Sequence, residues 1–253
     1  MKRATPVMLA LCGLGAAVVL TASSAFASTL MTETFSYANG GLVAGSGGNW
    51  TTHSGTGTDI QVVSGHAAGD MTNAPDDNRT FAAQGATAKT FACFTVNIPS
   101  VVGTPSTNYF LHFKDTGTIN FAARVFVVPS GTTFTFGLST STSSPTATWP
   151  TALNYGQTYV VAIDYDAAAG TSDLWVNPAD ETSPKITGAV GTTGFLISAL
   201  AMRESATITP AGSVLWKYNV DDVAVGTTFN DACAGQPTGT NSSTWGRVKI
   251  LYR

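Results

Sequence analysis

Short hydrophobic runs follow one another through residues 29–226, separated by glycine, serine, threonine, asparagine and proline. Several runs alternate as β-strands do. In 158–166, for example, Tyr159, Val161 and Ile163 share one face. Turn-forming residues bound each run, as expected for successive strands. The pattern predicts strands at 31–36, 59–63, 79–83, 89–98, 107–114, 121–128, 132–138, 158–166, 171–177, 194–203 and 213–225.

The last predicted strand contains a change of phase. The hydrophobic positions of 213–225 change parity at Asp221 and Asp222, which predicts a β-bulge there. No stretch of ten or more residues has a strong helical stripe, although 227–233 has room for one short helical turn. We therefore predict an all-β protein. No composition boundary divides 28–233, which we interpret as one domain.

The start of the chain has the features of a secretory signal peptide. Two basic residues precede an apolar run at 7–20, and an Ala-Phe-Ala sequence at 25–27 provides a cleavage site before Ser28. The apolar run is shorter than the ~20 residues that a membrane-spanning helix needs. We expect residues 1–27 to be removed, and the mature protein to be secreted to the extracellular space or the cell surface.

The end of the chain differs in composition from the rest. Residues 234–243 have the glycine, proline, threonine and serine content of a linker, and 244–253 contains three basic residues. We therefore interpret 234–253 as a linker and C-terminal tail. Its final segment is a frayed terminus, an added edge strand or a recognition tail for sorting or attachment machinery.

Charge and composition narrow the class of protein. Charged residues make up 11% of the 253-residue chain, and there is no basic surplus, which argues against a nucleic-acid binder. Glutamate occurs at only three positions, Glu33, Glu181 and Glu204, and lysine is scarce, which argues against a helical bundle. The abundance of threonine and glycine agrees with strands and turns.

Two cysteines, Cys93 and Cys233, remain after removal of the signal peptide. In an oxidising compartment an even pair suggests one disulfide, which would connect the end of the domain to a mid-chain strand. Two separate buried thiols are the alternative, because free cysteine packs as a small hydrophobe. The sequence leaves both open.

Several motifs support a family resemblance. They are Glu33-Thr-Phe-Ser-Tyr37, Asn39-Gly-Gly-Leu42, Gly47-Gly-Asn-Trp50, Ile163-Asp-Tyr-Asp166, Asp173-Leu-Trp-Val-Asn-Pro178 and Asn219-Val-Asp-Asp-Val-Ala-Val-Gly226. Residues 29–233 resemble concanavalin A-like, laminin-G-like jelly-roll proteins exported to bacterial surfaces, of the kind abundant in Planctomycete and Verrucomicrobia-type genomes. The resemblance implies a sandwich of two antiparallel sheets in which the first and last strands are neighbours. It implies little about function, because this fold supports lectins, glycan hydrolases, lyases and structural modules.

The sequence argues against catalysis. Glycan hydrolases need two carboxylates flanking the scissile bond, and those of this fold usually place them in an E-x-D-x-E strand, which this chain lacks. His112 stands without a partner motif, so we interpret it as a sheet-face histidine. The three histidines also lack the spacing of a zinc site. A glycan hydrolase or lyase remains a distant alternative.

The hairpin at 158–177 is the first candidate binding site. Asp164 and Asp166 share one face of its first strand, and Asp173, Trp175 and Asn177 share one face of its second. An outward tryptophan beside carboxylates and an amide would stack on a sugar ring and bind its hydroxyl groups. In the alternative interpretation, Trp175 covers a sheet beneath a loop and the acids only solubilise a turn.

A second candidate is the segment from Asp70 to Asn78, where Asp70, Asp76 and Asp77 supply the hard oxygen ligands that Ca²⁺ prefers. Asx-rich turns without an ion give the same pattern. No other cofactor is expected. Together the observations favour an exported, non-catalytic β-sandwich module that binds a glycan or another extracellular ligand. A structural envelope or matrix protein is the alternative.

Overall fold

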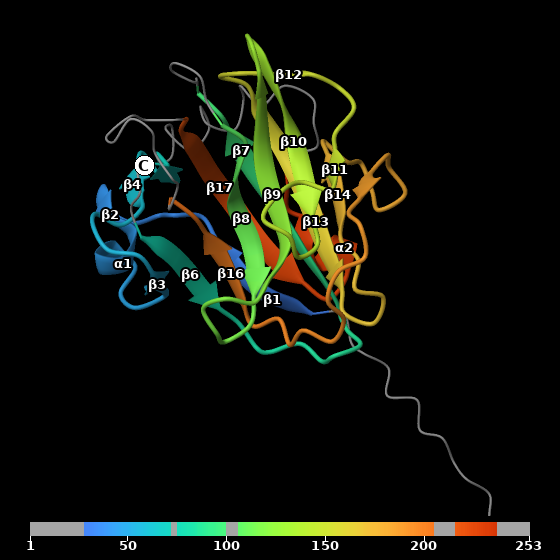
Figure 1. Ribbon diagram of the computed structural model, residues 1–253. Coiled ribbons are helices and arrows are strands. Elements are labelled where there is room, and N and C mark those ends of the chain that lie inside the picture. The colour runs from blue at the N-terminus through green and yellow to red at the C-terminus, as the bar shows by residue number, and fades with distance from the viewer. Residues whose placement is uncertain (1–27, 72–74, 100–105, 205–215, 237–253) are drawn as a thin grey trace, which may run out of the picture.

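The computed structural model describes residues 28–71, 75–99, 106–204 and 216–236. These residues form two antiparallel β-sheets packed face to face, which confirms the predicted all-β sandwich (Figure 1). The predicted signal peptide lies outside the described residues, as does most of the predicted tail.

One sheet has nine strands. They are β1 (Thr29–Glu33), β2 (Gly40–Gly41), β4 (Gln61–Val63), β5 (His66–Gly69), β7 (Lys89–Asn97), β13 (Thr158–Asp166), β14 (Asp173–Val176), β15 (Ile186–Thr187) and β17 (Tyr218–Gly226). Their order is β15-β14-β13-β7-β17-β5-β4-β2, and β1 also pairs with β17. The first and last strands are therefore neighbours, as the family resemblance implied.

The other sheet has eight strands. They are β3 (Trp50–Ser54), β6 (Asp76–Thr80), β8 (Asn108–Lys114), β9 (Phe121–Ser130), β10 (Thr133–Ser139), β11 (Ala147–Thr148), β12 (Leu153–Asn154) and β16 (Ala199–Met202). Their order is β11-β10-β9-β8-β16-β6-β3, and β12 also pairs with β10. This sheet is nearer the viewer in Figure 1. Two short helices complete the described chain, α1 (Leu42–Gly45) and α2 (Phe229–Cys233).

The main hydrophobic core lies between the two sheets. Phe94 on β7, Phe110 on β8 and Phe136 on β10 are fully buried and pack across it, with Trp216 and Tyr218 beside Phe110. Complete burial of an aromatic side chain stabilises the fold by roughly 1.5–3 kcal/mol relative to leaving the side chain exposed. Neither helix of the described residues is long and apolar enough to cross a membrane.

The predicted bulge is confirmed. The pairing of β17 with β7 shifts register between Asp221 and Ala224, and Asp222 has a φ of +51°. The shift lets Val220 and Val223 both face the core although they differ in parity. The first half of β17 then pairs with β5 and its second half with β1.

Helix α2 covers a second, smaller hydrophobic cluster on the outer face of the nine-stranded sheet. Phe229 of α2 packs against Phe91 and Trp175 there. Cys93 on β7 and Cys233 in α2 form a disulfide, with 5.3 Å between their Cα atoms. The sequence left open a disulfide or two separate buried thiols, and the structure shows the disulfide. The helical turn predicted at the end of the domain is confirmed.

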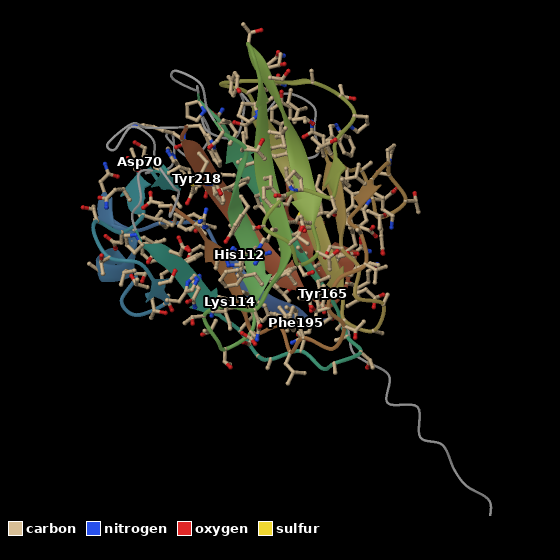
Figure 2. The ribbon with its side chains drawn as sticks, viewed as in Figure 1. Asp70, His112, Lys114, Tyr165, Phe195 and Tyr218 are labelled. Carbon is tan, nitrogen blue, oxygen red and sulfur yellow. A yellow bond between two sulfur atoms is a disulfide. The ribbon has the colours of Figure 1, made fainter. Side chains whose placement is uncertain are left out.

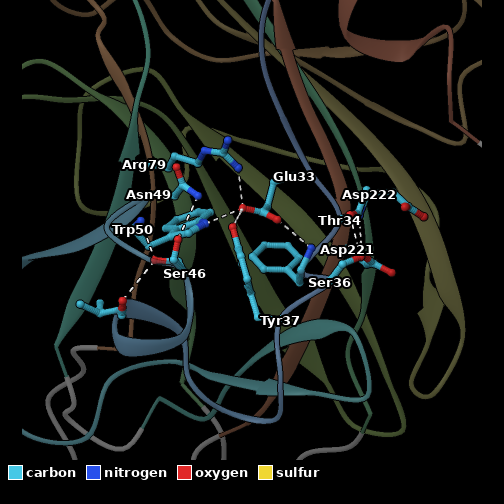
Figure 3. A network of polar contacts seen from close by, with 12 residues as sticks. Glu33, Thr34, Ser36, Tyr37, Ser46, Asn49, Trp50, Arg79, Asp221 and Asp222 are labelled. Carbon is cyan, nitrogen blue, oxygen red and sulfur yellow. Dashed lines mark hydrogen bonds and ion pairs between the residues drawn. The ribbon is translucent and has the colours of Figure 1, made fainter. Parts of the chain in front are cut away.

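Two of the motifs that support the family resemblance meet at one buried carboxylate (Figure 3). The side chain of Glu33 accepts hydrogen bonds from the Tyr37 hydroxyl at 2.8 Å, from Trp50 Nε1 at 2.9 Å and from Arg79 at 2.5 Å. It also accepts the Phe35 backbone N–H at 2.8 Å. With four donors, Glu33 anchors the first strand to the far edge of the eight-stranded sheet.

Candidate functional site

The predicted binding residues of β13 and β14 lie on the outer face of the nine-stranded sheet, and the fold itself occupies their polar atoms. Asp164 accepts the Asp173 backbone N–H at 2.9 Å and pairs with Lys89 at 2.8 Å. Asp173 accepts the Thr187 hydroxyl and pairs with Lys185, both at 2.5 Å. Burial raises the pKa of Asp164 to about 6.

The expectation that Trp175 is available for sugar stacking is wrong. Leu174 faces the main core and Trp175 faces the opposite way, as predicted, but the Trp175 ring is 0% exposed. Phe229 of α2 packs on the ring, and Trp175 Nε1 donates to the Glu181 carbonyl at 3.2 Å. The alternative interpretation, a tryptophan covering a sheet, describes the structure.

The side-chain oxygens of the two remaining predicted residues of the hairpin also accept hydrogen bonds from the backbone. Asp166 accepts the Ala169 backbone N–H at 2.9 Å. Asn177, with a φ of +51°, accepts the Val160 N–H at 2.9 Å. The Asp166 contact is one that Asx residues commonly make at chain reversals, whereas the Asn177 contact connects the end of β14 to β13.

The predicted calcium segment is not a continuous loop. Asp76 and Asp77 belong to β6, where Asp77 accepts from the Thr52 hydroxyl at 2.8 Å and the Ile60 N–H at 3.2 Å. Within the described ranges, no group of three or more His, Cys, Asp or Glu residues is arranged to hold a metal ion. Calcium binding that involves Asp70, Asp76 and Asp77 stays a prediction.

The strongest candidate site is on the outer face of the eight-stranded sheet, where the sequence predicted only a sheet-face histidine. In β8, Phe110, Leu111 and Phe113 belong to the core, whereas Tyr109, His112 and Lys114 do not. The pairing of β8 with β9 shifts register twice along this stretch. These bulges place two consecutive residues in the core and put His112 on the same face as Tyr109. Figure 2 shows His112 and Lys114 close together on β8.

Neighbouring strands supply the other members of this group. Arg124 comes from β9, Phe121 from the start of β9, His53 from β3, and Arg203 directly follows β16. We call His53, Tyr109, His112, Phe121, Arg124 and Arg203 the outer-face cluster. The two guanidinium groups both contact Tyr109, at 5.2 Å for Arg124 and 4.4 Å for Arg203 from the ring centre. Such cation–π contacts fix the positions of both the rings and the charges.

Among the described residues, the two histidines of the outer-face cluster have no hydrogen-bond partner, and the pKa values of both are lowered. Their ring centres lie 6.1 Å apart, and Phe121 packs against His112 at 4.2 Å. Burial lowers the pKa of His53 to about 4, with a further contribution from the positive charge of Lys114. Burial also lowers the pKa of His112 well below its usual value, and the nearby cations lower it further.

Unsatisfied polar atoms are concentrated in this cluster. Both ring nitrogens of His53 and His112, and Nε of Arg124, are buried without a hydrogen-bond partner within the structure as described. A buried polar atom left unpaired costs about 1–3 kcal/mol. Most buried polar atoms of native proteins are paired, so such a concentration calls for an explanation, and a ligand supplies one.

Sequence reasoning missed this cluster because its members come from four strands far apart in the chain. One local signal was present. Arg124 interrupts the otherwise apolar run at 121–128, and arginine is rarely buried without a partner. The rest depends on strand order and on the bulges of β8, which bring Arg203 and His53 beside His112.

Comparisons with known proteins support the fold. No protein-family model matches the chain, and no curated protein matches its sequence. The structure is similar to that of the alginate lyase Aly36B, with a TM-score of 0.54 and 12% identity, covering 78% of this chain and 96% of that chain. It is also similar to the CBM2 module of the evolved Dit of Lactobacillus casei BL23 phage J-1, with a TM-score of 0.51 and 11% identity, covering 80% of this chain and 96% of that chain. At these identities, the likeness establishes the jelly-roll sandwich alone.

Proposed function

We propose that this chain is an exported, non-catalytic β-sandwich module of the bacterial surface-protein type that its motifs resemble. In this proposal residues 1–27 are removed, 28–233 form the domain and 234–253 serve as linker and sorting tail. The domain binds an extracellular glycan through the outer-face cluster. The observation that supports this most is the concentration of unpartnered, buried side-chain nitrogens among aromatic rings on one sheet face.

A glycan suits this combination of groups. Sugar rings have an apolar face that stacks on aromatic side chains, and hydroxyl groups that exchange hydrogen bonds with imidazole and guanidinium nitrogens. Tyr109 and Phe121 provide rings, while His53, His112 and Arg124 provide the nitrogens. The names of the two similar structures, an alginate lyase and a carbohydrate-binding module, agree with a glycan as ligand.

The proposal includes that the module is non-catalytic. The positions of the three glutamates, the candidate catalytic carboxylates, support this part. Glu33 accepts four hydrogen bonds in a structural network. Glu181 lies in an exposed loop, and Glu204 is buried directly after β16. Glu33 is thus committed to the fold and Glu181 is an exposed loop residue, while Glu204 lies near Asp70, Asp77 and Asp59, whose charges add to the effect of burial on its pKa.

A glycan lyase is the second candidate, and one observation favours it. The rings of Tyr109 and His112 lie 5.5 Å apart beside Arg124, and His112 is held neutral, so that it can accept a proton. Incubating the mature protein with a glycan panel and measuring new reducing ends and unsaturated uronates separates the two candidates. Product formation would replace the binding module with the lyase.

Binding itself is tested with one matched pair of histidine variants. His53→Ala changes the outer-face cluster, whereas His66→Ala changes a partly buried histidine of β5 in the other sheet. On a glycan array, we expect binding by the wild type and by His66→Ala, and about tenfold weaker binding by His53→Ala. Failure of the wild type to bind any glycan would favour the structural envelope or matrix protein. Equal binding by both variants would exclude the outer-face cluster as the site.

A further inference from the structure

Arg124 of the outer-face cluster and the neighbouring Lys114 differ from the ion-paired cations of the described chain. Arg79, Lys89 and Lys185 each have a largely buried carboxylate oxygen within 2.5–2.8 Å. Arg124 and Lys114, in contrast, have no carboxylate at ion-pair distance among the described residues, although both are at least nine-tenths buried. Their side chains donate to backbone carbonyls, Arg124 to Ser141 and Lys114 to Asp115.

The outer face of the eight-stranded sheet therefore holds several positive charges with few carboxylates beside them. Arg203 and Arg124 contact one tyrosine ring. The only carboxylate near Arg203 within the described residues is Asp76, at 3.8 Å, and Asp76 also accepts the Ser54 hydroxyl and the Glu204 N–H. Like charges held close together in a partly buried place repel each other unless an anion joins them.

We propose that the glycan bound by the outer-face cluster is anionic, a suggestion that rests on the proposed function above. A carboxylate or sulfate group of the sugar would lie between the guanidinium groups of Arg124 and Arg203 and form charge-assisted hydrogen bonds with them. Arg124 Nε, which is unpartnered in the structure, is one such donor. The neutral nitrogens of His53 and His112 would exchange hydrogen bonds with hydroxyl groups of the same sugar.

The two neutral histidines fit this division of roles. Because burial and the surrounding cations lower both pKa values, the histidines add no positive charge at neutral pH. They remain able to donate from one nitrogen and accept at the other, which suits sugar hydroxyl groups. The arginines alone then select for the charged group of the ligand. Selection for charge and recognition of the sugar thus belong to different side chains.

Matched neutral and anionic glycans test the inference. Isothermal titration of the mature protein would compare polygalacturonate with its methyl ester, and dextran sulfate with dextran, at low and moderate salt. We expect the anionic form of at least one pair to bind at least tenfold more tightly than its neutral form. The pair that shows the difference identifies the group as carboxylate or sulfate.

Two arginine variants and one lysine control locate the effect. Arg124→Gln and Arg203→Gln should each weaken anionic binding about tenfold, and Lys217→Gln, which removes an exposed charge directly before β17, should leave it unchanged. Arg203 is the more exposed arginine, so its variant serves if Arg124→Gln does not fold. If Lys217→Gln weakened binding equally, the binding would be explained by unspecific charge attraction, and the inference would be overturned. Equal binding of neutral and anionic glycans would overturn it too, while leaving the proposed function in place; no binding to any glycan would overturn both.

Discussion

At the scale of single residues, two buried charged side chains differ in whether an opposite charge lies beside them. Glu33 is 5% exposed and is surrounded by donors, including Arg79. Arg124 is 9% exposed and has no comparable acid among the described residues. The Glu33 charge is thus balanced by groups of the fold itself. The second case, Arg124, is the reason for placing the candidate site on the eight-stranded sheet.

Removal of the Glu33 carboxylate should destabilise the protein strongly. In Glu33→Ala, the buried Trp50 Nε1 and the Arg79 guanidinium lose their acceptor. Breaking such a buried pair costs about 3–5 kcal/mol, so we expect a loss of that size in urea unfolding followed by tryptophan fluorescence. Glu181→Gln is the control, because the Glu181 side chain is half exposed and 3.7 Å from Lys89. A change of less than about 1 kcal/mol in Glu33→Ala would contradict the structural role of this network.

Glu204 should make the stability of the protein depend on pH. Burial raises the pKa of Glu204 from 4.5 to about 8, so between these values the folded state keeps a proton that the unfolded state has lost. The contribution of Glu204 to the free energy of unfolding is therefore greatest below about pH 4.5, declines as the pH rises and levels off above about pH 8.

The Glu204→Gln variant isolates that dependence. Glutamine keeps the oxygen that accepts the Asp70 N–H but carries no titrating proton. We expect the unfolding free energy of the wild type to fall by a few kcal/mol between pH 5 and pH 8, and that of Glu204→Gln to fall much less. Urea unfolding at a series of pH values measures both. Parallel curves for the two proteins would show that Glu204 is not responsible.

At the scale of elements, hydrophobic alternation predicted the long strands well and the short polar ones poorly. The predicted strand 158–166 has the observed bounds of β13, and 89–98 differs from β7 by one residue. The strands β3 and β5 were missed. One is the largely polar Trp-Thr-Thr-His-Ser and the other is His-Ala-Ala-Gly. Neither has a hydrophobic alternation that marks a strand, and both pair with neighbouring strands.

The candidate site shows the same limit more clearly. The sequence showed which faces of β13 and β14 point away from the core, but not that α2 returns to cover Trp175. In β8, the alternation of core-facing and outward-facing residues breaks at Phe110 and Leu111. The cause, a shift in the register of pairing with β9, is visible only in the structure. Faces of single strands are local properties, whereas the covering of a face is a property of the assembled sandwich.

The α2 element provides the next prediction. Its capping box joins Thr228 and Asp231, but a five-residue helix has little stability of its own, so its disulfide to β7 should matter. Replacing both Cys93 and Cys233 with serine should cost about 2–5 kcal/mol, since the bridge closes a loop between residues 140 positions apart. We expect the tryptophan fluorescence of the protein, to which Trp175 contributes, to shift toward that of exposed tryptophan at lower urea concentration than in the wild type. Unchanged unfolding would show that packing of Phe229 alone holds the helix in place.

At the scale of the whole molecule, the two ends of the sandwich meet. The backbone nitrogen of Ser28 lies 2.9 Å from the Asp231 carboxylate and 3.1 Å from the Thr227 hydroxyl, and Thr227 N–H donates to the Ser28 carbonyl. Asp231 belongs to α2, whose last residue is disulfide-bonded to β7 in the middle of the sheet. The beginning, middle and end of the described chain are therefore tied together on one side of the molecule.

This arrangement gives the predicted cleavage before Ser28 a consequence for stability. If the signal peptide is removed before Ser28, the Ser28 nitrogen becomes a positively charged amino group beside Asp231 rather than an amide. A charge-assisted bond then replaces a neutral one, and for an exposed pair this contributes about 0.5–1 kcal/mol. A chain that begins at Ser28 should therefore be more stable in urea than one that retains Ala27. The difference should vanish when both chains carry Asp231→Asn, because the partner charge is gone. Equal stability of the two chains with Asp231 present would show that the contact of Ser28 with Asp231 gains nothing from a charged amino group, and the intact mass of the exported protein tests the cleavage position itself.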